Sequence, residues 1–237
     1  MTLAPFVLSR FSKDTTILQG TTSVSLGDFN YFHGRHRRQV REDINTLKKL
    51  LGCAAAPLVL VQQVHGCRIK AVRTKPKTRL TYFSGCDALI TGKRGLLIGI
   101  LTADCLPVFL YDRRQHVIGL VHAGWRGIAK GIVPATISKM NKLYHTSPAD
   151  IIAGIGPHIS ARHYEIDAET AKKLGLPAKG RIQANLAGLV EEQLARAGIP
   201  QRSIETSLIC TYTSKHCYSY RRQAKKAGRL LSFLLLK

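Results

Sequence analysis

The apolar residues of this 237-residue chain gather into short runs that are almost free of polar side chains. Such runs, separated by brief polar or Gly breaks, are typical of buried strands. They predict strands over residues 57–66, 68–74, 87–92, 96–104, 107–112 and 116–124, a strand and loop over 151–159, a strand over 207–212, and a last strand within 221–237.

Other segments repeat their apolar residues at helical spacing. In "QVREDINTLKKLLG" the residues Val40, Ile44 and Leu47 share one face and Gly52 provides a stop, so an amphipathic helix is expected over residues 39–52. Helices are also predicted over 131–145, 168–175 and 185–199, and an exposed basic loop over 28–39. Apolar strands mixed with helices predict an α/β sandwich with helices covering the sheets.

The charge of the chain is unusual, whereas its apolar content is ordinary. Lys and Arg exceed Asp and Glu by 36 − 14 = 22, and 45% of the residues are hydrophobic. Such a charge predicts attraction to phosphates, nucleic acid or acidic membranes. The basic residues are spread out and no motif for specific nucleic-acid readout accompanies them, so we expect at most non-specific electrostatic binding of nucleic acid.

No membrane or export segment is evident. The chain starts without a charged region followed by an apolar stretch, and its longest apolar run is interrupted by Asp104 and Pro107. The six cysteines form no CxxC pair, which favours free thiols in a reducing compartment. A cytoplasmic protein without membrane contact is expected.

Three polar residues stand at the ends of predicted strands: His65 in "QQVHG", Cys105 in "TADCLP" and His122 in "VHAGWRG". Two imidazoles and a thiolate make a three-ligand zinc set that leaves a fourth position for water. The residues also suit a Cys nucleophile with a His base, or a blue-copper set and an oxidase. Copper oxidation is the weaker alternative, because a multicopper oxidase commonly carries its many His ligands in H-x-H pairs. This chain has nine His and no H-x-H pair. Taken singly, each residue also fits a buried structural position.

Further polar residues lie near these strand ends. Asp104 could orient a ligand His, act as an acid or base, or simply cap the loop. Asp87 is a candidate for lining the site and for moving a proton. Arg126 stands where a helix is expected to begin, a place suited to an anion, although a surface Arg is equally consistent with so basic a chain. The remaining candidates for lining a site or binding phosphate are Gln63, His158 and Arg221.

A set of motifs in this chain resembles the YfiH family, also called the laccase-domain, polyphenol-oxidase-like or peptidoglycan-editing-factor family. The motifs are "QQVHG", "CDALIT", "LTADCLPV", "GLVHAGWRG", "GIGPHIS" with "YEID", and "CTY" through "YSYRR" plus "GR", in that order. The similarity spans residues 20–237, and "TADC" followed by "HAGWRG" is its most specific part.

The resemblance implies a single domain over residues 1–237. Its fold would be a four-layer α/β/β/α sandwich with mixed sheets, also described as cysteine-hydrolase-like. It implies zinc held by His65, Cys105 and His122. The implied chemistry acts on small-molecule nucleosides with phosphate: phosphorolysis of adenosine, inosine, guanosine and methylthioadenosine, and deamination of adenosine. An older label is copper-dependent polyphenol oxidation, and some members are linked to removing wrongly built peptidoglycan precursors.

Two positions depart from the family pattern. An Asn-Arg pair, whose Arg is associated with phosphate, is replaced by Asp43-Ile44, which cannot supply the grip of a guanidinium on phosphate. Arg41 or Arg38 is a candidate substitute, and whether phosphorolysis survives this departure stays open. His158 replaces the Cys of the usual "GPCIG".

In the expected mechanism, zinc-activated hydroxide attacks the purine carbon that bears the amine. Asp104 or Asp87 moves the proton, and Arg126 positions phosphate for phosphorolysis. A copper-dependent phenol oxidase, a peptidoglycan-precursor hydrolase and an inactive nucleic-acid-binding relative are the alternatives. The physiological substrate and the oligomeric state stay open.

Overall fold

A computed structural model describes residues 5–32, 37–177 and 179–237, and most of its strands belong to two sheets. One sheet has the strand order β1-β13-β6-β2-β4 and the other β12-β9-β7-β8-β5-β3, while β10 and β11 form a separate pair. The strands are β1 Ile17–Thr21, β2 Leu58–Gln62, β3 Ile69–Ala71, β4 Leu80–Ser84, β5 Ala88–Thr91, β6 Leu97–Thr102, β7 Leu106–Asp112, β8 Val117–Ala123, β9 Ile151–Ile155, β10 Glu165–Ile166, β11 Ile182–Gln183, β12 Ile204–Thr206 and β13 Leu230–Leu236.

The helices differ widely in length. The α-helices are α1 Ser9–Ser12, α2 Arg37–Leu50, α3 Trp125–Ala129, α4 Ile132–Tyr144, α5 Ala168–Lys173, α6 Leu186–Arg196 and α7 Tyr220–Gln223. Single 3-10 turns are η1 Val24–Leu26, η2 Pro148–Asp150, η3 Ala161–His163, η4 Gln201–Ser203 and η5 Ala224–Lys226. None of the described helices combines the length and hydropathy needed to cross a bilayer.

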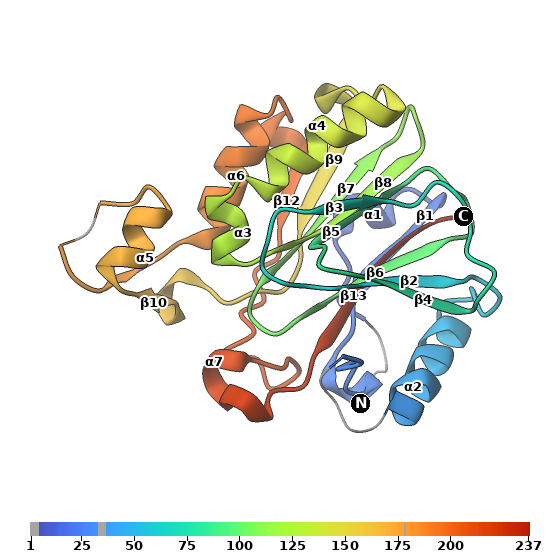
Figure 1. Ribbon diagram of the computed structural model, residues 1–237, viewed down its shortest axis with the longest axis horizontal. Coiled ribbons are helices and arrows are strands. Elements are labelled where there is room, and N and C mark those ends of the chain that lie inside the picture. The colour runs from blue at the N-terminus through green and yellow to red at the C-terminus, as the bar shows by residue number, and fades with distance from the viewer. Residues whose placement is uncertain (1–4, 33–36, 178) are drawn as a thin grey trace.

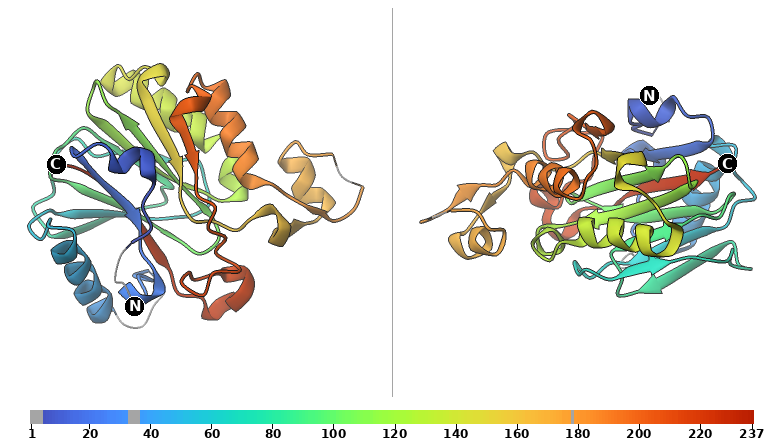
Figure 2. Two further views of the ribbon diagram at one scale, coloured as in Figure 1. Left: turned by 180° about the vertical axis from the view of Figure 1, so that it is seen from behind. Right: turned by 90° about the horizontal axis from the view of Figure 1, so that it is seen from above.

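The two large sheets face each other, and helices cover both outer faces (Figures 1 and 2). Helix α2 covers the five-stranded sheet, whereas α3, α4 and α6 cover the six-stranded one. Three clusters of buried apolar residues fill the three interfaces between these layers. Examples are Ile44 with Phe233 under α2, Ile98 with Phe109 between the sheets, and Val121 with Ile137 under α4. The structure confirms the predicted four-layer α/β/β/α sandwich.

Both large sheets mix parallel and antiparallel pairs. In the first, β2 runs parallel to β4 and β6, while β13 lies antiparallel between β1 and β6. In the second, β7 is antiparallel to β8 and β9, and β12 is parallel to β9. The central strands, β6 in the first sheet and β7 and β8 in the second, are buried on both faces, which explains their largely apolar sequences.

Two predictions about local structure are wrong. No strand forms over residues 207–212; the strand of this region is β12, which ends at Thr206. Residues 207–212 form a loop, in which Cys210 makes an isolated β-bridge to His158. The segment 28–39 is not a wholly exposed loop, because Phe29 and Tyr31 are buried under α2 and the helix begins at Arg37. The pattern misled because a run of basic residues follows the two buried aromatics closely in the chain. Residues 33–36 lie outside the described part.

One connection matters most for the candidate residues. Strand β6 ends at Thr102 in the five-stranded sheet, and β7 begins at Leu106 in the six-stranded sheet. The three residues between them carry the chain from one sheet to the other, and Asp104 takes a φ of 90° there. The run that reads as one apolar stretch is therefore two strands joined by a tight crossing that holds Asp104 and Cys105.

Candidate functional site

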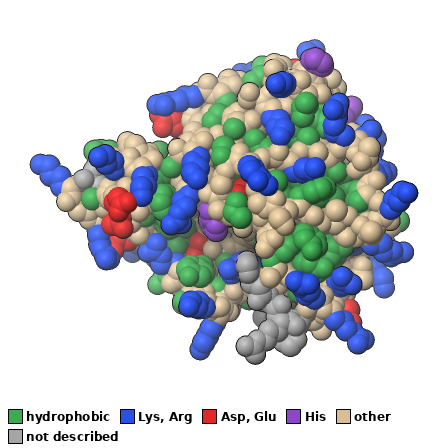
Figure 3. Space-filling model, in the orientation of Figure 1, with side chains coloured by type: hydrophobic (Ala, Val, Ile, Leu, Met, Phe, Trp, Pro, Cys, Tyr) green, Lys and Arg blue, Asp and Glu red, His purple; other side chains and the backbone are tan. Residues whose placement is uncertain are grey.

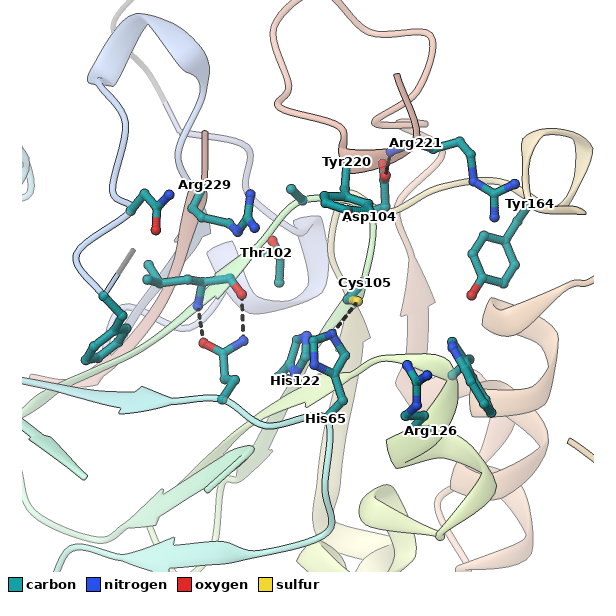
Figure 4. Close-up of a pocket in the computed structure, with 16 residues that line it drawn as sticks. His65, Thr102, Asp104, Cys105, His122, Arg126, Tyr164, Tyr220, Arg221 and Arg229 are labelled. Atoms are coloured by element: carbon teal, nitrogen blue, oxygen red, sulfur yellow. Dashed lines mark hydrogen bonds between the residues drawn. The ribbon is translucent and has the colours of Figure 1, made fainter. Parts of the chain in front are cut away.

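The structure brings His65, Cys105 and His122 together at one end of the sheets (Figure 4). His65 lies in the loop after β2, Cys105 in the crossing from β6 to β7, and His122 in β8. Their donor atoms lie within 4.8 Å of one another, and Cys105 Sγ is 3.9 Å from His65 Nε2. Across the described ranges, this is the group of His, Cys, Asp and Glu side chains whose spacing suits a metal ion.

Asp87, just before β5, holds two members of this trio in place. Its carboxylate accepts hydrogen bonds from the backbone N–H groups of His65 (2.8 Å) and Gly66 (2.8 Å), and it lies 2.9 Å from His122 Nδ1. With Nδ1 engaged in this way, the other ring nitrogen of His122 is the one left for a ligand. Burial alone would raise the pKa of Asp87, but the hydrogen bonds from His122 and the backbone lower it below its ordinary value. Asp87 therefore acts from behind the trio as a positioning group.

The trio fits a metal ion in its chemistry and its spacing. Bonds of about 2.0 Å to nitrogen and about 2.3 Å to sulfur place the two ligand atoms about 3.5 Å apart in a tetrahedral site. The observed sulfur–nitrogen separation of 3.9 Å is close to this value. The missing side chain at Gly124 leaves room for the metal, because a Cβ atom at this position would lie 2.9 Å from the His65 ring and 3.1 Å from Cys105 Sγ.

Without a metal, the surroundings of Cys105 and His122 favour a thiolate beside an imidazolium. Burial raises the pKa of a thiol, but the positive charge of His122 and hydrogen bonds from both imidazoles lower the pKa of Cys105 to about 6. Burial lowers the pKa of an imidazole, but the Cys105 thiolate and the Asp87 carboxylate raise the pKa of His122 to about 9. The site thus supplies a thiolate, the form that binds metals, at neutral pH.

A cavity of about 540 Å³ opens beside the trio. Its wall includes three arginines, Arg126, Arg221 and Arg229, and aromatic side chains including Trp125 and Tyr164. The guanidinium of Arg126 lies over the Trp125 ring and that of Arg221 over the Tyr164 ring. Among the described residues, no carboxylate lies within ion-pair distance of these three guanidinium groups. The cavity therefore offers positive charge to an anion beside the trio.

Asp104 lines the cavity, and both of its carboxylate oxygens accept hydrogen bonds. Oδ1 accepts from the Thr211 hydroxyl at 2.6 Å and Oδ2 from the Arg221 backbone N–H at 2.6 Å. Its backbone carbonyl accepts from the Ile159 N–H at 3.0 Å. Asp104 therefore ties the crossing between the sheets to helix α7, which carries Arg221.

The other predicted site residues divide into two groups. Gln63 lines the cavity, but its amide donates to the Leu101 carbonyl and accepts from the Leu101 N–H. Arg126 and Arg221 line the cavity as expected. His158 is not part of its wall: it is buried, its Nδ1 lies 2.9 Å from the Gly156 carbonyl, and burial lowers its pKa.

The expected substitutes for the family's Asn-Arg pair also lie away from the cavity wall. Ile44 packs in the core under α2, and Asp43 accepts a hydrogen bond from the Gln39 amide. Arg38 pairs with Glu42 on the surface, and Arg41 donates to the Tyr31 hydroxyl. In the described part of the chain, positive charge reaches the cavity from other elements instead.

Sequence reasoning assigned no role to several residues that line the cavity. They are Asn30, Phe32, Thr102, Trp125, Tyr164, Tyr220 and Arg229. The motifs "YEID" and "GR" contain Tyr164 and Arg229, but nothing in their spacing places them beside Cys105. Burial, reinforced by the negative charge of the Cys105 thiolate, raises the pKa of Tyr164 to about 12, so its phenol stays protonated.

A sequence profile described as "Multi-copper polyphenol oxidoreductase laccase" matches residues 15–237. The chain belongs to this laccase-like family. This confirms the resemblance seen in the motifs, because the solved structures that match include a Bacillus licheniformis protein titled YfiH. That structure superposes with a TM-score of 0.87 at 28% identity, covering 99% of this chain and 97% of the other.

Relatives in the laccase-like family carry a different functional name. A Bacteroides thetaiotaomicron protein named purine nucleoside phosphorylase is 29% identical over 94% of this chain and 90% of its own length. A Streptomyces coelicolor protein of the same name is 34% identical over 79% of this chain and 78% of its own. The structure of YlmD from Geobacillus stearothermophilus gives a TM-score of 0.87 at 28% identity, covering 94% of this chain and 93% of the other.

Proposed function

We propose that this chain is a zinc-dependent purine nucleoside phosphorylase, with His65, Cys105 and His122 as the metal ligands. The observation that supports this most directly is the presence of the trio and three arginines without carboxylate partners in one cavity. A phosphorolytic enzyme must bind an anion next to a nucleoside, and this cavity joins positive charge to aromatic walls. The names of the relatives point to the same chemistry.

The residues have separate tasks in this proposal. Zinc bound by the trio would supply Lewis acidity and activate water at its open position. Arg126, Arg221 and Arg229 bind and orient phosphate for attack at the anomeric carbon, while Trp125 and Tyr164 pack against the nucleoside. Asp87 holds the imidazole of His122 and the backbone of His65 in place from behind. Asp104 holds the crossing that presents Cys105, which makes it a positioning group.

The surface charge supports an anionic co-substrate without requiring nucleic acid. Figure 3 shows Lys and Arg side chains spread over the visible face rather than gathered in one stripe. A distributed positive field raises the local concentration of phosphate and speeds its arrival. Salt-sensitive DNA binding that is unaffected by removing the metal would favour the nucleic-acid alternative.

The decisive experiment is product identification from adenosine with zinc-loaded protein, with and without phosphate. Phosphorolysis predicts free adenine and a ribose phosphate only when phosphate is present. Inosine formed without phosphate would show the deaminase instead, and copper-dependent oxygen uptake with a phenol would show the oxidase. Absence of nucleoside turnover in metal-loaded protein contradicts the proposal.

The arginines provide a second test. Replacing Arg126 or Arg229 with Gln removes charge-assisted hydrogen bonds worth about 1.5–3 kcal/mol each, so the KM for phosphate should rise by about 10-fold or more. Arg196→Gln is the matched control, because Arg196 pairs with Glu192 on the surface of α6. An unchanged KM for phosphate in both cavity variants would contradict phosphate binding by Arg126 and Arg229.

A further inference from the structure

A second cluster of reactive side chains lies outside the wall of the cavity. Cys210 stands in the loop after β12, and Ser160 and His163 belong to the segment that leads into and through η3. Cys210 Sγ accepts hydrogen bonds from the Ser160 N–H (3.3 Å) and the Ser160 hydroxyl (3.2 Å). It also lies 3.8 Å from His163 Nδ1. Three polar groups from a distant part of the chain thus converge on one sulfur.

This environment stabilises a thiolate. A thiolate is a strong hydrogen-bond acceptor and a thiol sulfur a weak one, so donors aimed at the sulfur favour the charged form. The His163 ring stacks on the Tyr212 ring, with centroids 4.7 Å apart, and this packing keeps the imidazole beside the sulfur. Burial raises the pKa of Cys210, but hydrogen bonds from Ser160 and from backbone N–H groups lower it to about 6.

The remaining cysteines provide a comparison within the same molecule. Cys86 and Cys217 are buried, and Cys105 belongs to the trio. Cys53 and Cys67 are half-buried like Cys210, yet burial raises the pKa of both. Cys210 therefore differs from its partly exposed counterparts by the donors around it and not by its exposure.

We propose that Cys210 is a modification site that undergoes thiol–disulfide exchange with low-molecular-weight disulfides, preferably acidic ones. The Cys210 thiolate attacks one sulfur of the disulfide, a new sulfur–sulfur bond forms, and the old one breaks. The second sulfur leaves as a thiolate, so Cys210 is oxidised to a mixed disulfide while half of the reagent is reduced. Arg162, exposed on η3, and the net charge of +22 favour an anionic reagent.

The position of this cysteine connects it to the site described above. Thr211 follows Cys210 directly and donates the hydrogen bond to Asp104. Ser160 follows Ile159, whose N–H binds the Asp104 carbonyl. An adduct on Cys210 therefore forms beside both segments that support the crossing before Cys105.

The test uses the full chain, oxidised glutathione as the probe, and peptide mass mapping under non-reducing conditions at neutral pH. We expect a dithiothreitol-reversible adduct on Cys210 that forms about tenfold faster or more than adducts on Cys53 and Cys67. Cys210→Ser should abolish this adduct. Ser160→Ala and His163→Gln should slow the exchange several-fold at neutral pH, with less effect at alkaline pH, where any thiol ionises.

The pH profile provides a readout that does not depend on folding of a variant. For the unmodified protein, the rate of Cys210 alkylation by iodoacetamide should level off above about pH 7. Equal exchange rates at Cys210, Cys53 and Cys67 would overturn the proposal. So would a Cys210 rate that keeps rising to about pH 9, as for an ordinary thiol. These readouts are masses and rates, so they are independent of whether the protein acts on nucleosides.

Discussion

The carboxylate of Asp87 lies 2.9 Å from the Nδ1 atom of His122, and both side chains are buried. The same carboxylate accepts the backbone N–H of His65 at 2.8 Å. One acidic residue therefore contacts the imidazole of His122 and anchors the backbone of His65, two residues that are far apart in the chain. A negative charge behind a ligand His fixes its tautomer and raises its basicity, which strengthens a metal bond.

Asp87→Asn should weaken metal binding by about 10- to 100-fold, because an amide keeps the shape but lacks the charge behind His122. Competition with a chromophoric chelator measures this affinity. Asp150→Asn is the matched control, since Asp150 pairs with Arg114 on the surface at 3.7 Å. Equal affinities in wild type and Asp87→Asn would show that the carboxylate does not tune the site.

Cys105→Ser should reduce the zinc content from about one ion per chain to nearly none, because a serine hydroxyl stays protonated and is a poor zinc ligand. Elemental analysis of the purified variant provides the measurement. Cys67→Ser is the control, because the Cys67 thiol donates to the Lys130 carbonyl at 3.4 Å and takes no part in the trio. Full zinc content in Cys105→Ser would refute the assignment of this ligand.

Asp104→Asn and Thr211→Val test whether Asp104 positions the crossing or transfers a proton. Thr211→Val removes the hydrogen bond between these side chains. Asp104→Asn leaves one acceptor oxygen for the two donors, the Thr211 hydroxyl and the Arg221 N–H. In either variant, leaving a buried partner unsatisfied costs about 1–3 kcal/mol. Positioning predicts that both variants lower the thermal midpoint and kcat to a similar extent. A kcat loss of about 100-fold in Asp104→Asn with normal turnover in Thr211→Val would instead identify proton transfer.

The ion pair in the metal-free site predicts how metal affinity depends on pH. With the pKa of Cys105 at about 6 and that of His122 at about 9, the site holds a thiolate and an imidazolium between these values. Binding then releases the proton of His122 but none from Cys105. The logarithm of the affinity should therefore rise by about one per pH unit between about pH 6 and pH 9, more steeply below and hardly at all above. Chelator competition across this range checks the slope, and a flat profile contradicts the assigned charge states.

Much of the fold follows from local pattern. The apolar runs of β6, β7, β8 and β13 could be identified because strands buried on both faces need apolar residues throughout. The strand β4 escaped detection because its side chains are half exposed and mixed in character. The prediction of a strand over residues 207–212 is wrong because one of its apolar residues, Leu208, is almost fully exposed in a loop.

The pattern of the sequence by itself determined an α/β sandwich with helices covering the sheets, because burial leaves a periodic record along the chain. The four-layer arrangement and the three proposed metal ligands were expected from the family resemblance of its motifs. Only the tertiary structure decided which polar groups meet. It placed Asp87 behind the trio, left His158 outside the cavity wall, and brought Arg229 and Tyr164 to the cavity. These relationships depend on how β6 crosses to β7 and on how distant loops pack, and such long-range contacts leave no periodic trace in a single sequence.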